Sequence, residues 1–339
     1  MTKKILVRVD ASIEIGAGHF VRQLAFAQLL IDERFDVYFF TKTTQKELIN
    51  QAIEEGVHIQ TLASSMSIEA DAQETVAYAK KINAHWVILD GYSFVTDYQQ
   101  TLKDEGLKLL CVDDMAHCHF VADIVLNQNT TDGRIYSKEP YTQLLMGPEF
   151  ALLRREFRLF ESKKVIRNEI KDIMITMGGS DEKNMTETIL KWLLRLPELN
   201  GVRCHIVLGS LNPYKDLISA LISQSNLDGK IYTSLSAKEM LNLMQSVDFA
   251  ITAAGSTVWE YMKVGVPFVS IKLFDNQKLV SDTIINNLQG YVLPQVKYDC
   301  LRKGVNLMFD FKIRSNMSFQ QSIISNSMKN RVVLNLLCL

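Results

Sequence analysis

Short apolar runs alternate with amphipathic stretches in two successive series, and this alternation limits the possible folds more than any other feature of the chain. In the first series the expected strands are residues 5–9, 36–40, 57–62, 86–89, 107–112 and 123–126, and the expected helices include 45–55, 68–83 and 96–105. Strands that alternate with helices favour βαβ units and a parallel sheet. Several of these strands are unbroken apolar runs, as is typical of parallel strands buried on both faces.

The alternation restarts after a charged stretch that is predicted to be helical over residues 152–164. The second series has expected strands at 172–177, 203–208, 230–233, 248–252 and 267–273, and expected helices at 181–194, 213–225, 237–246, 256–264 and 277–288. The sequence therefore predicts two α/β domains, residues 1–155 and 156–296, followed by a mainly helical tail at 297–339. A ligand is expected in the cleft between the domains, at the carboxyl ends of both sheets.

Composition excludes several classes of partner. The 339 residues suffice for about two domains, and a formal net charge of −1 supplies no basic field for nucleic acid or an anionic membrane. No apolar run approaches the roughly 20 residues that span a bilayer. The first residues do not resemble a signal peptide, and the five cysteines are scattered without a pairing pattern. A reduced, cytoplasmic location is therefore expected.

The first strand runs into a glycine-containing loop that brings a histidine to the start of a helix. Gly16 and Gly18 lack side chains, so a ligand can approach the backbone closely. The start of the helix offers unpaired N–H groups and a positive dipole end. His19 suits proton transfer at neutral pH, and Arg22 lies one turn later on the same face. The segment indicates an anion site with a base, and a tight turn with a packing histidine is the alternative.

Small residues also form two later turns, each between an expected strand and a helix. The first consists of Gly178, Gly179 and Ser180, and the second consists of Gly255, Ser256 and Thr257. Asp181 can cap the helix that follows the first turn. Glu260 follows the second turn, where a carboxylate suits the helix dipole or can accept ribose hydroxyls. Asn276 and Gln277 end a later strand and suit either sugar binding or a turn.

Together these loops fit a nucleotide diphosphate bound at the carboxyl ends of two α/β halves. The sequence does not contain a P-loop motif. It also departs from the dinucleotide-binding fingerprint, because Val21 stands where the third glycine would be. The loops therefore favour a ligand that carries a nucleotide diphosphate, and they match neither of these two motifs.

Five segments carry a resemblance to a known family: residues 8–22, 147–154, 177–181, 254–260 and 276–277. They resemble the UDP-2,4-diacetamido-2,4,6-trideoxy-β-L-altropyranose hydrolases of pseudaminic acid biosynthesis. That family is related to spore coat polysaccharide proteins and to MurG-type glycosyltransferases. The resemblance covers residues 3–292 and implies a GT-B fold, in which two Rossmann-like domains face a central cleft.

The resemblance also implies roles for individual residues. His19 matches the catalytic base that activates water, and Tyr92 and Asn276 match further active-site residues. Glu260 matches the acid that binds ribose, while Arg154 lies in a family motif and has an interdomain salt bridge as its alternative role. The expected substrate-binding set is Asp10, Gly16, Gly18, Arg22, Arg154, Gly178, Gly179, Ser180, Gly255, Ser256, Thr257, Glu260 and Gln277.

The function that follows is hydrolysis of a UDP-linked 2,4-diacetamido-2,4,6-trideoxy sugar to free sugar and UDP, in nonulosonic acid or surface polysaccharide biosynthesis. No cofactor or metal is expected. A glycosyltransferase of the same fold would use His19 to activate an acceptor hydroxyl instead of water. The same residues would also suit a sugar-nucleotide epimerase or an inactive module that binds a sugar nucleotide.

A histidine-rich segment raises the possibility of a metal site. His117 and His119 alternate along the chain and share a face if extended, and Cys111 is nearby in sequence. A fourth ligand at suitable spacing is missing, so an ordinary polar loop is expected. Asp113 and Asp114 can form an acid–base pair, but neighbours on a strand point to opposite faces, and a turn cap is expected instead.

Overall fold

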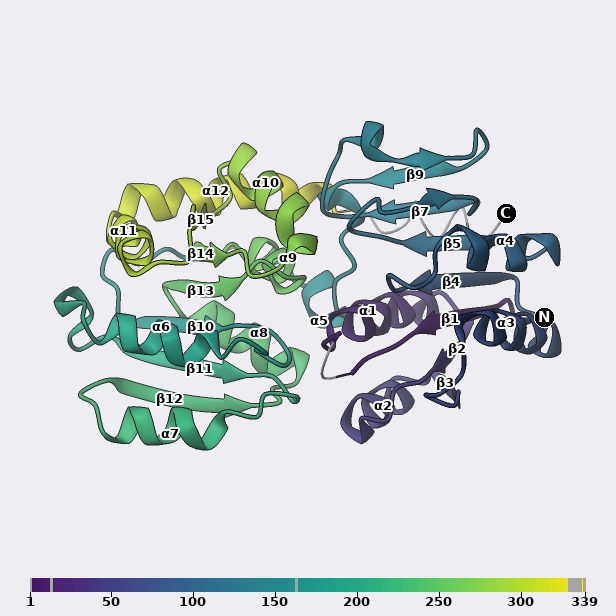
Figure 1. Cartoon of the computed structure of the whole chain (residues 1–339). Helices are drawn as coiled ribbons and strands as arrows, with labels where there is room; N and C mark the ends of the chain where they lie inside the picture. The colour runs from purple at the N-terminus through teal and green to yellow at the C-terminus, as the bar shows by residue number, and fades with distance from the viewer. Residues whose placement is uncertain (1, 13–14, 162–163, 329–336, 338–339) are drawn as a thin grey trace. The chain divides into compact units, whose positions relative to one another are not determined.

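The computed structural model describes residues 2–12, 15–161, 164–328 and 337. The chain divides into two compact units, which we call unit 1 (Met1–Arg154 with Met328–Leu339) and unit 2 (Arg155–Ser327). Each unit is built on its own parallel sheet with helices packed against it (Figure 1). Cys338 and nearly all of the predicted tail beyond residue 328 lie outside the described residues.

Unit 1 contains a seven-stranded sheet in the order β3-β2-β1-β4-β5-β7-β9. Its strands are β1 (Lys4–Val9), β2 (Asp36–Thr41), β3 (His58–Thr61), β4 (Trp86–Asp90), β5 (Leu109–Val112), β7 (Ile124–Asn127) and β9 (Gln143–Met146). Its helices are α1 (Gly18–Asp32), α2 (Lys46–Glu54), α3 (Ile68–Ile82) and α4 (Thr96–Asp104). The sequence predicted the first six strands and these helices, but not β9 or the short pair β6 (His119–Phe120) and β8 (Ser137–Lys138).

The register of the central strands determines which loops become neighbours. Val9 pairs with Asp90 between β1 and β4, and Asp90 pairs with Val112 between β4 and β5. The three strands therefore end in one row, because parallel strands share their carboxyl edge. Side chains such as Ile5 and Val87 are fully buried, since helices cover both faces of a sheet of this kind. The loops after β1, β4 and β5 thus start side by side.

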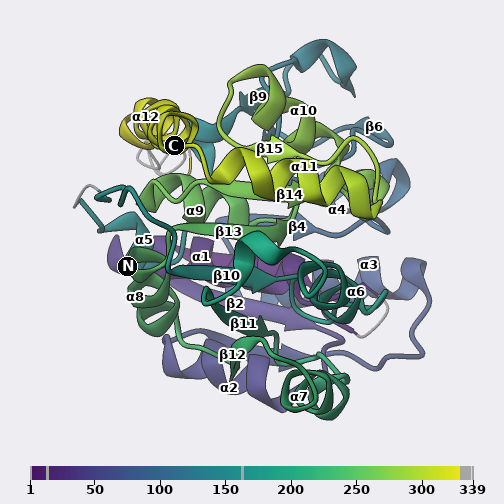
Figure 2. The ribbon, with the colours of Figure 1, turned by 90° about the vertical axis from the view of Figure 1, so that its left-hand side faces the viewer.

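Unit 2 contains a six-stranded parallel sheet in the order β12-β11-β10-β13-β14-β15. Its strands are β10 (Asp172–Thr176), β11 (Arg203–Leu208), β12 (Asp228–Thr233), β13 (Phe249–Ala253), β14 (Phe268–Ile271) and β15 (Tyr291–Val292). Its helices are α5 (Arg155–Arg158), α6 (Met185–Leu193), α7 (Lys215–Ser223), α8 (Ala237–Ser246), α9 (Thr257–Val264), α10 (Lys278–Asn286), α11 (Tyr298–Met308) and α12 (Phe311–Ser327). Helices α6, α7 and α11 lie on one face of the sheet, and α8, α9 and α12 on the other (Figure 2). Of the six strands, only the two-residue β15 was not predicted.

Several predicted helices are shorter in the structure, and two of them differ for a local reason. In the stretch predicted as helix over 152–164, the described residues (152–161 and 164) are helical only in α5, and the N–H of Leu152 donates instead to the side-chain oxygen of Gln128 at 2.9 Å. The helix predicted from residue 181 begins at Met185. Asp181 has a left-handed backbone (φ 47°), which ends the preceding turn and turns its carboxylate back onto the helix start.

The two last helices of unit 2 are tied to its beginning. The buried guanidinium of Arg314 on α12 donates to the carbonyl oxygens of Arg167 and Asn168, at 2.6 and 2.9 Å, and to that of Met308. Further along α12, Gln321 donates to the carbonyl oxygen of Val266 at 3.0 Å. These bonds make α11 and α12 part of the unit that begins before β10.

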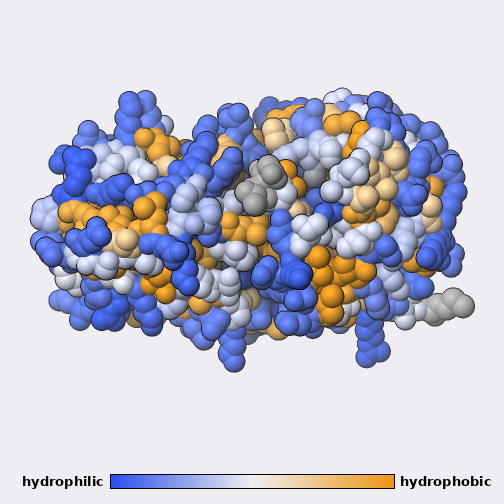
Figure 3. Space-filling model, turned by 60° about the horizontal axis from the view of Figure 1, so that its bottom comes forward, coloured by the Kyte–Doolittle hydropathy of each residue, from blue (hydrophilic) through white to orange (hydrophobic). Residues whose placement is uncertain are grey.

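The surface alternates between hydrophilic and hydrophobic areas (Figure 3). Large apolar side chains that are more than half exposed include Leu159, Val165, Leu288 and Phe319. Each comes from a different element or loop, and scattered exposure of this kind is ordinary for globular proteins. Within the described part of the chain, every helix is too short or too polar to cross a membrane.

Candidate functional site

In unit 1 the candidate site is built where β1, β4 and β5 end. His19 is the second residue of α1, which follows the loop after β1. Asp90 is the last residue of β4, and Asp114 comes two residues after β5. Since these strands are adjacent, their loops bring the three side chains into one buried cluster. This placement agrees with the general rule that ligands bind at the carboxyl edge of such sheets.

Asp90 is the centre of this cluster. Its carboxylate is 1% exposed and accepts hydrogen bonds from the Nε and Nη2 atoms of Arg22, at 2.9 and 2.6 Å. Gln23 donates to the same carboxylate from Nε2 at 2.7 Å. Burial alone would raise the pKa of Asp90, but the charge of Arg22 and the hydrogen bonds outweigh it and lower the pKa to about 2. Asp90 is therefore an anion at neutral pH.

The imidazole of His19 lies against this anion. Its Nδ1 atom is 2.7 Å from Oδ1 of Asp90, and an ionised carboxylate can only accept, so Nδ1 carries the hydrogen. The Nη2 atom of Arg22 is 3.1 Å from the same Nδ1, and both N–H groups converge on Asp90. Nε2 is consequently left as the basic nitrogen. This is the geometry of a histidine held in one tautomer by a carboxylate.

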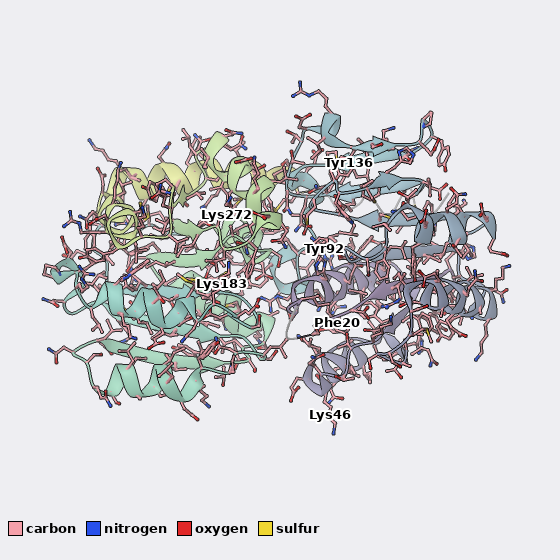
Figure 4. All side chains as sticks on the ribbon, viewed as in Figure 1. Phe20, Lys46, Tyr92, Tyr136, Lys183 and Lys272 are labelled. Carbon is pink, nitrogen blue, oxygen red and sulfur yellow. The ribbon has the colours of Figure 1, made fainter. Side chains whose placement is uncertain are left out.

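Tyr92 lies on the loop after β4 and faces His19. The two rings meet edge-to-face, with centroids 4.8 Å apart and an interplanar angle of 83° (Tyr92 is labelled in Figure 4). The structure thus brings Tyr92, which the family resemblance singled out, next to His19 and Arg22, which the sequence placed on one helix face. The tyrosine is partly exposed and packs against the imidazole ring.

Within the described part of the chain, the N-cap position of α1 provides no side-chain cap. Its N-cap residue, Ala17, makes no capping hydrogen bond, and the first turn contains no acidic residue. Free N–H groups and the dipole at such an end favour an anion. Gly18 is exposed at this end, and Gly16 lies in the preceding loop with a positive φ of 74°. Both glycines therefore lie in the loop and at the helix start that the sequence predicted between β1 and α1.

Two other predicted residues of unit 1 have different surroundings. Asp10 accepts two hydrogen bonds from the Arg8 guanidinium, at 2.6 and 2.7 Å, and one from the N–H of Lys42 at 2.6 Å. These bonds fix the start of the loop after β1, so Asp10 has a structural role whatever else it contacts. Arg154 is half-buried, and it is the last residue before unit 2 begins.

The histidine-rich segment forms a polar turn. Asp113 accepts from the N–H groups of Met115 and Ala116, at 3.0 and 2.7 Å, as a turn cap does. His117 pairs with Asp113 at 3.3 Å and contacts the carbonyl oxygen of Tyr92 at 3.0 Å. His119 contacts the surface residue Glu139 instead. Among the described residues, no group of three or more acidic, cysteine or histidine side chains is arranged to hold a metal.

In unit 2 the predicted turns follow β10 and β13, which are adjacent strands. Gly178 has a positive φ of 93°, and Gly179 touches the next loop at Gly209. A Cβ on Gly209 would lie 2.3 Å from the carbonyl oxygen of Gly179, so these two loops meet backbone to backbone. Ser180 is half-buried beside them.

The start of α6 is occupied by the protein itself. The two carboxylate oxygens of Asp181 accept from the N–H groups of Met185 and Thr186, at 2.8 and 2.9 Å. The cap proposed for Asp181 is confirmed, and burial raises the pKa of its carboxyl. Because a carboxylate already fills this end of the helix, an anion at this turn would have to bind residues 178–180 rather than α6.

The turn after β13 is more open. Gly255 has nothing within 4 Å of the position of a Cβ, and Ser256 makes no side-chain cap to α9. Thr257 begins the helix, and Glu260 is buried in its first turns with 7% exposure. The backbone at this turn is therefore accessible to a ligand, and the helix start is not filled by a cap.

The segment after β14 contains the last two predicted residues, Asn276 and Gln277. Both are half-buried, in a short 3-10 helix. The Oε1 atom of Gln277 accepts from the N–H of Leu273 at 2.7 Å, which leaves its NH2 group for other contacts. Lys183, labelled in Figure 4, donates to the carbonyl oxygen of Leu273 at 2.6 Å and thereby joins the loops after β10 and β14.

Four residues that shape these sites were not among the predicted site residues: Gln23, Asp90, Asp114 and Gly209. Asp90 and Gly209 could have been identified from the sequence, since each stands at the carboxyl end of a predicted central strand, where ligands bind in sheets of this kind. Asp114 was considered only as a pair with Asp113. Its real partner is Arg22, whose Nη1 donates to Asp114 Oδ2 at 3.1 Å, and this contact depends on strand order.

The curated relatives are distant in sequence, but their alignments cover most of this chain. No model of a known protein family matches the chain. The chain is 28% identical to an uncharacterised protein of Methanocaldococcus jannaschii over 310 residues, 86% of this chain and 62% of that protein. It is 28% identical over 284 residues to the UDP-2,4-diacetamido-2,4,6-trideoxy-beta-L-altropyranose hydrolase of Campylobacter jejuni (81% and 93%). It is 22% identical over 288 residues to the Bacillus subtilis spore coat polysaccharide biosynthesis protein SpsG (84% and 81%).

Solved structures share the fold over nearly the whole chain. MurG of Acinetobacter baumannii aligns with a TM-score of 0.68 at 16% identity, over 98% of this chain and 99% of that one. Phytolacca americana UGT2, complexed with UDP-2fluoro-glucose and pterostilbene, aligns with a TM-score of 0.59 at 14% identity (97% and 95%). The fold is thus GT-B, and the chain is a distant relative, at 22–28% identity, of the hydrolase and of the spore coat protein.

Proposed function

We propose that the protein hydrolyses a UDP-linked 2,4-diacetamido-2,4,6-trideoxy sugar to the free sugar and UDP, in nonulosonic (pseudaminic) acid or surface polysaccharide biosynthesis. The observation that carries this proposal is the 2.7 Å contact between His19 Nδ1 and Asp90, beside a helix start whose N-cap residue, Ala17, makes no capping hydrogen bond. A histidine held in one tautomer is a suitable general base, and the helix start suits an anionic substrate. The Campylobacter jejuni relative supports this choice of substrate.

In the proposed reaction, His19 Nε2 takes a proton from water while the water oxygen attacks the anomeric carbon. The bond from that carbon to the diphosphate oxygen breaks, and its electron pair leaves with UDP. Asp90 stabilises the imidazolium that forms, as the carboxylate of a catalytic triad does. N–H groups at the start of α1 and in the turns of unit 2 would stabilise the charge that grows on the leaving diphosphate.

We assign the sugar to residues 1–155 and the nucleotide to residues 156–296. In unit 2, the turns at 178–180 and 255–257 would contact the diphosphate and uridine, and Glu260 would accept the ribose hydroxyls. Tyr92 and Asn276 would contact the sugar near the bond that breaks. Gln277 would donate from its NH2 group, because its oxygen is held by Leu273.

The decisive experiment is a coupled assay of UDP release from a panel of UDP-amino sugars in water alone. The panel includes the altrose donor and UDP-N-acetylglucosamine, and binding of UDP is measured in parallel. The proposal expects release from the altrose donor without an acceptor. It also expects His19→Ala to lose about 100- to 10,000-fold in turnover while still binding UDP.

The control is His58→Ala, because this exposed histidine on β3 stacks on Tyr38 away from the cluster and should keep full activity. Release that requires an added sugar acceptor would contradict hydrolysis and identify a glycosyltransferase. UDP binding without turnover on any donor would contradict both hydrolysis and glycosyl transfer and favour a module that only binds a sugar nucleotide.

A further inference from the structure

Arg22 lies between two buried carboxylates. Its Nε and Nη2 atoms donate to Asp90, and its Nη1 atom donates to Oδ2 of Asp114 at 3.1 Å. The Asp114 side chain is 9% exposed, and its second oxygen, Oδ1, is buried without a hydrogen-bond donor among the described residues. A half-paired buried carboxylate costs stability. Stability therefore does not explain why an acid stands at this position.

The charges around His19 offer an explanation. Asp90 attracts a proton to the imidazole, but the adjacent guanidinium of Arg22 opposes that attraction. Asp114 lies on the far side of the guanidinium and offsets it. When His19 is protonated, the two cations of the cluster balance its two carboxylates. Among the described residues, the other groups that face His19 are the Tyr92 ring and, beyond it, the ring of His117.

We propose that Asp114 is a positioning residue that sets the proton affinity of His19 through Arg22. Without its charge, Arg22 would neutralise Asp90 and make His19 a weaker base. The catalytic consequence rests on the function proposed above. The effect on the imidazole does not, because the cluster belongs to unit 1 alone and can be measured without substrate.

The first test is the titration of His19 by NMR in the ligand-free protein with labelled histidines. His19→Gln assigns the signal among the six histidines. We expect the NMR titration of His19 to move to lower pH in Asp114→Asn, because the variant keeps an acceptor for Arg22 and removes only the charge. Arg22→Gln should move this titration in the opposite direction.

The matched control is Asp132→Asn. Asp132 also pairs with an arginine, Arg134 at 2.8 Å, but this pair is exposed and lies outside the cluster. The control changes net charge equally and should leave the His19 titration in place. An equal shift in both variants, or no shift in Asp114→Asn, would overturn the proposal. If the asparagine variant does not fold, Asp114→Ser removes the same charge without burying an amide.

The second test is the pH profile of kcat/KM for UDP release. In Asp114→Asn the acid limb should move to lower pH by the shift that NMR records, and the plateau should fall about 3- to 10-fold. Asp114→Glu should return the acid limb of the kcat/KM profile to its position in the wild type. A rise in KM with an unchanged profile would show a purely structural or substrate-binding role. If the wild type releases no UDP from any donor, the hydrolase proposal fails, and the NMR titration still decides the role of Asp114.

Discussion

The guanidinium of Arg8 on β1 holds the carboxylate of Asp71 on α3 through two hydrogen bonds of 2.9 and 2.6 Å. Both side chains are almost completely buried, and Arg8 also binds Asp10 at the start of the loop that leads to His19. Burial alone would raise the pKa of Asp71, but the hydrogen bonds and charge of Arg8 lower it to about 2. This ion pair therefore fixes a sheet, a helix and the loop before His19 to one another.

We predict that Asp71→Asn destabilises the protein by about 3 kcal/mol, since it leaves a buried guanidinium with one carboxylate partner fewer. Urea unfolding followed by circular dichroism measures the change. The comparison variant is Glu105→Gln, which breaks the exposed pair with Lys80 and should cost at most about 1 kcal/mol. Equal losses in the two variants would show that burial of the Arg8 pair is unimportant.

Replacing Asp90 by asparagine should reduce kcat by about 100- to 10,000-fold and change KM much less. An amide can donate to Nδ1 of His19 and so favour the wrong tautomer. Combining Asp90→Asn with His19→Ala should lose little more than the single histidine variant, because the two residues act as one unit. Additive losses in the double variant would argue that they act separately. Asp104→Asn, on the surface of α4, is the control.

Two glycines of unit 2 should respond in opposite ways to alanine. Gly209→Ala would place a Cβ 2.3 Å from the backbone of Gly179 and should cost about 1–3 kcal/mol of stability. Gly255→Ala has open space and should change stability by less than about 0.5 kcal/mol. If the Gly255 turn holds the diphosphate, however, the added methyl should weaken UDP binding at least about tenfold. Calorimetry of UDP binding and thermal unfolding separate these effects, and unchanged affinity in Gly255→Ala would remove this turn from the site.

The pair of His117 and Asp113 should make stability depend on pH. The hydrogen bond to Asp113 raises the pKa of His117 in the folded protein. The contribution of this histidine to the free energy of unfolding is therefore complete below its pKa in the unfolded chain, and it is lost as pH rises through its pKa in the folded protein. Burial favours a higher pKa for Asp113, but hydrogen bonds from His117 and Tyr136 lower it, and its contribution disappears as pH falls through the folded value. The stabilisation is therefore largest between about pH 4 and 6.5.

The measurement is the difference in Tm between the wild type and His117→Gln at pH 5.5 and pH 8.5. The wild type should be more stable at pH 5.5, and most of this advantage should vanish at pH 8.5. A difference that is the same at both pH values would contradict this coupling. His58→Gln, a surface replacement on β3, controls for general effects of losing an imidazole.

Periodicity was sufficient to predict the central strands, because buried parallel strands are apolar runs of nearly fixed length. The edge strands β9 and β15 were not predicted, since Gln143–Met146 has an exposed end and Tyr291–Val292 is too short to show a hydrophobic pattern. The start of α6 was predicted four residues early. The hydrophobic pattern does not reveal that Asp181 adopts a left-handed backbone and caps the helix from outside.

The candidate site was predictable only in part, for a related reason. His19 and Arg22 share one helix face, so local spacing relates them to each other. Asp90 and Asp114 reach them only because β4 and β5 lie next to β1, and strand order cannot be read from spacing along the chain. Tyr92 was identified by resemblance, and its edge-to-face contact with His19 follows from the same strand order.

The bonds from Arg314 to the carbonyls of Arg167 and Asn168 join the last helix of unit 2 to its first segment. Unit 2 is therefore a single uninterrupted stretch of chain whose two ends are fastened together. Segments of this kind can be excised, inserted or exchanged as whole cassettes without cutting through a core. In evolutionary terms, such a unit can be inherited as one piece and recombined with a different neighbouring unit.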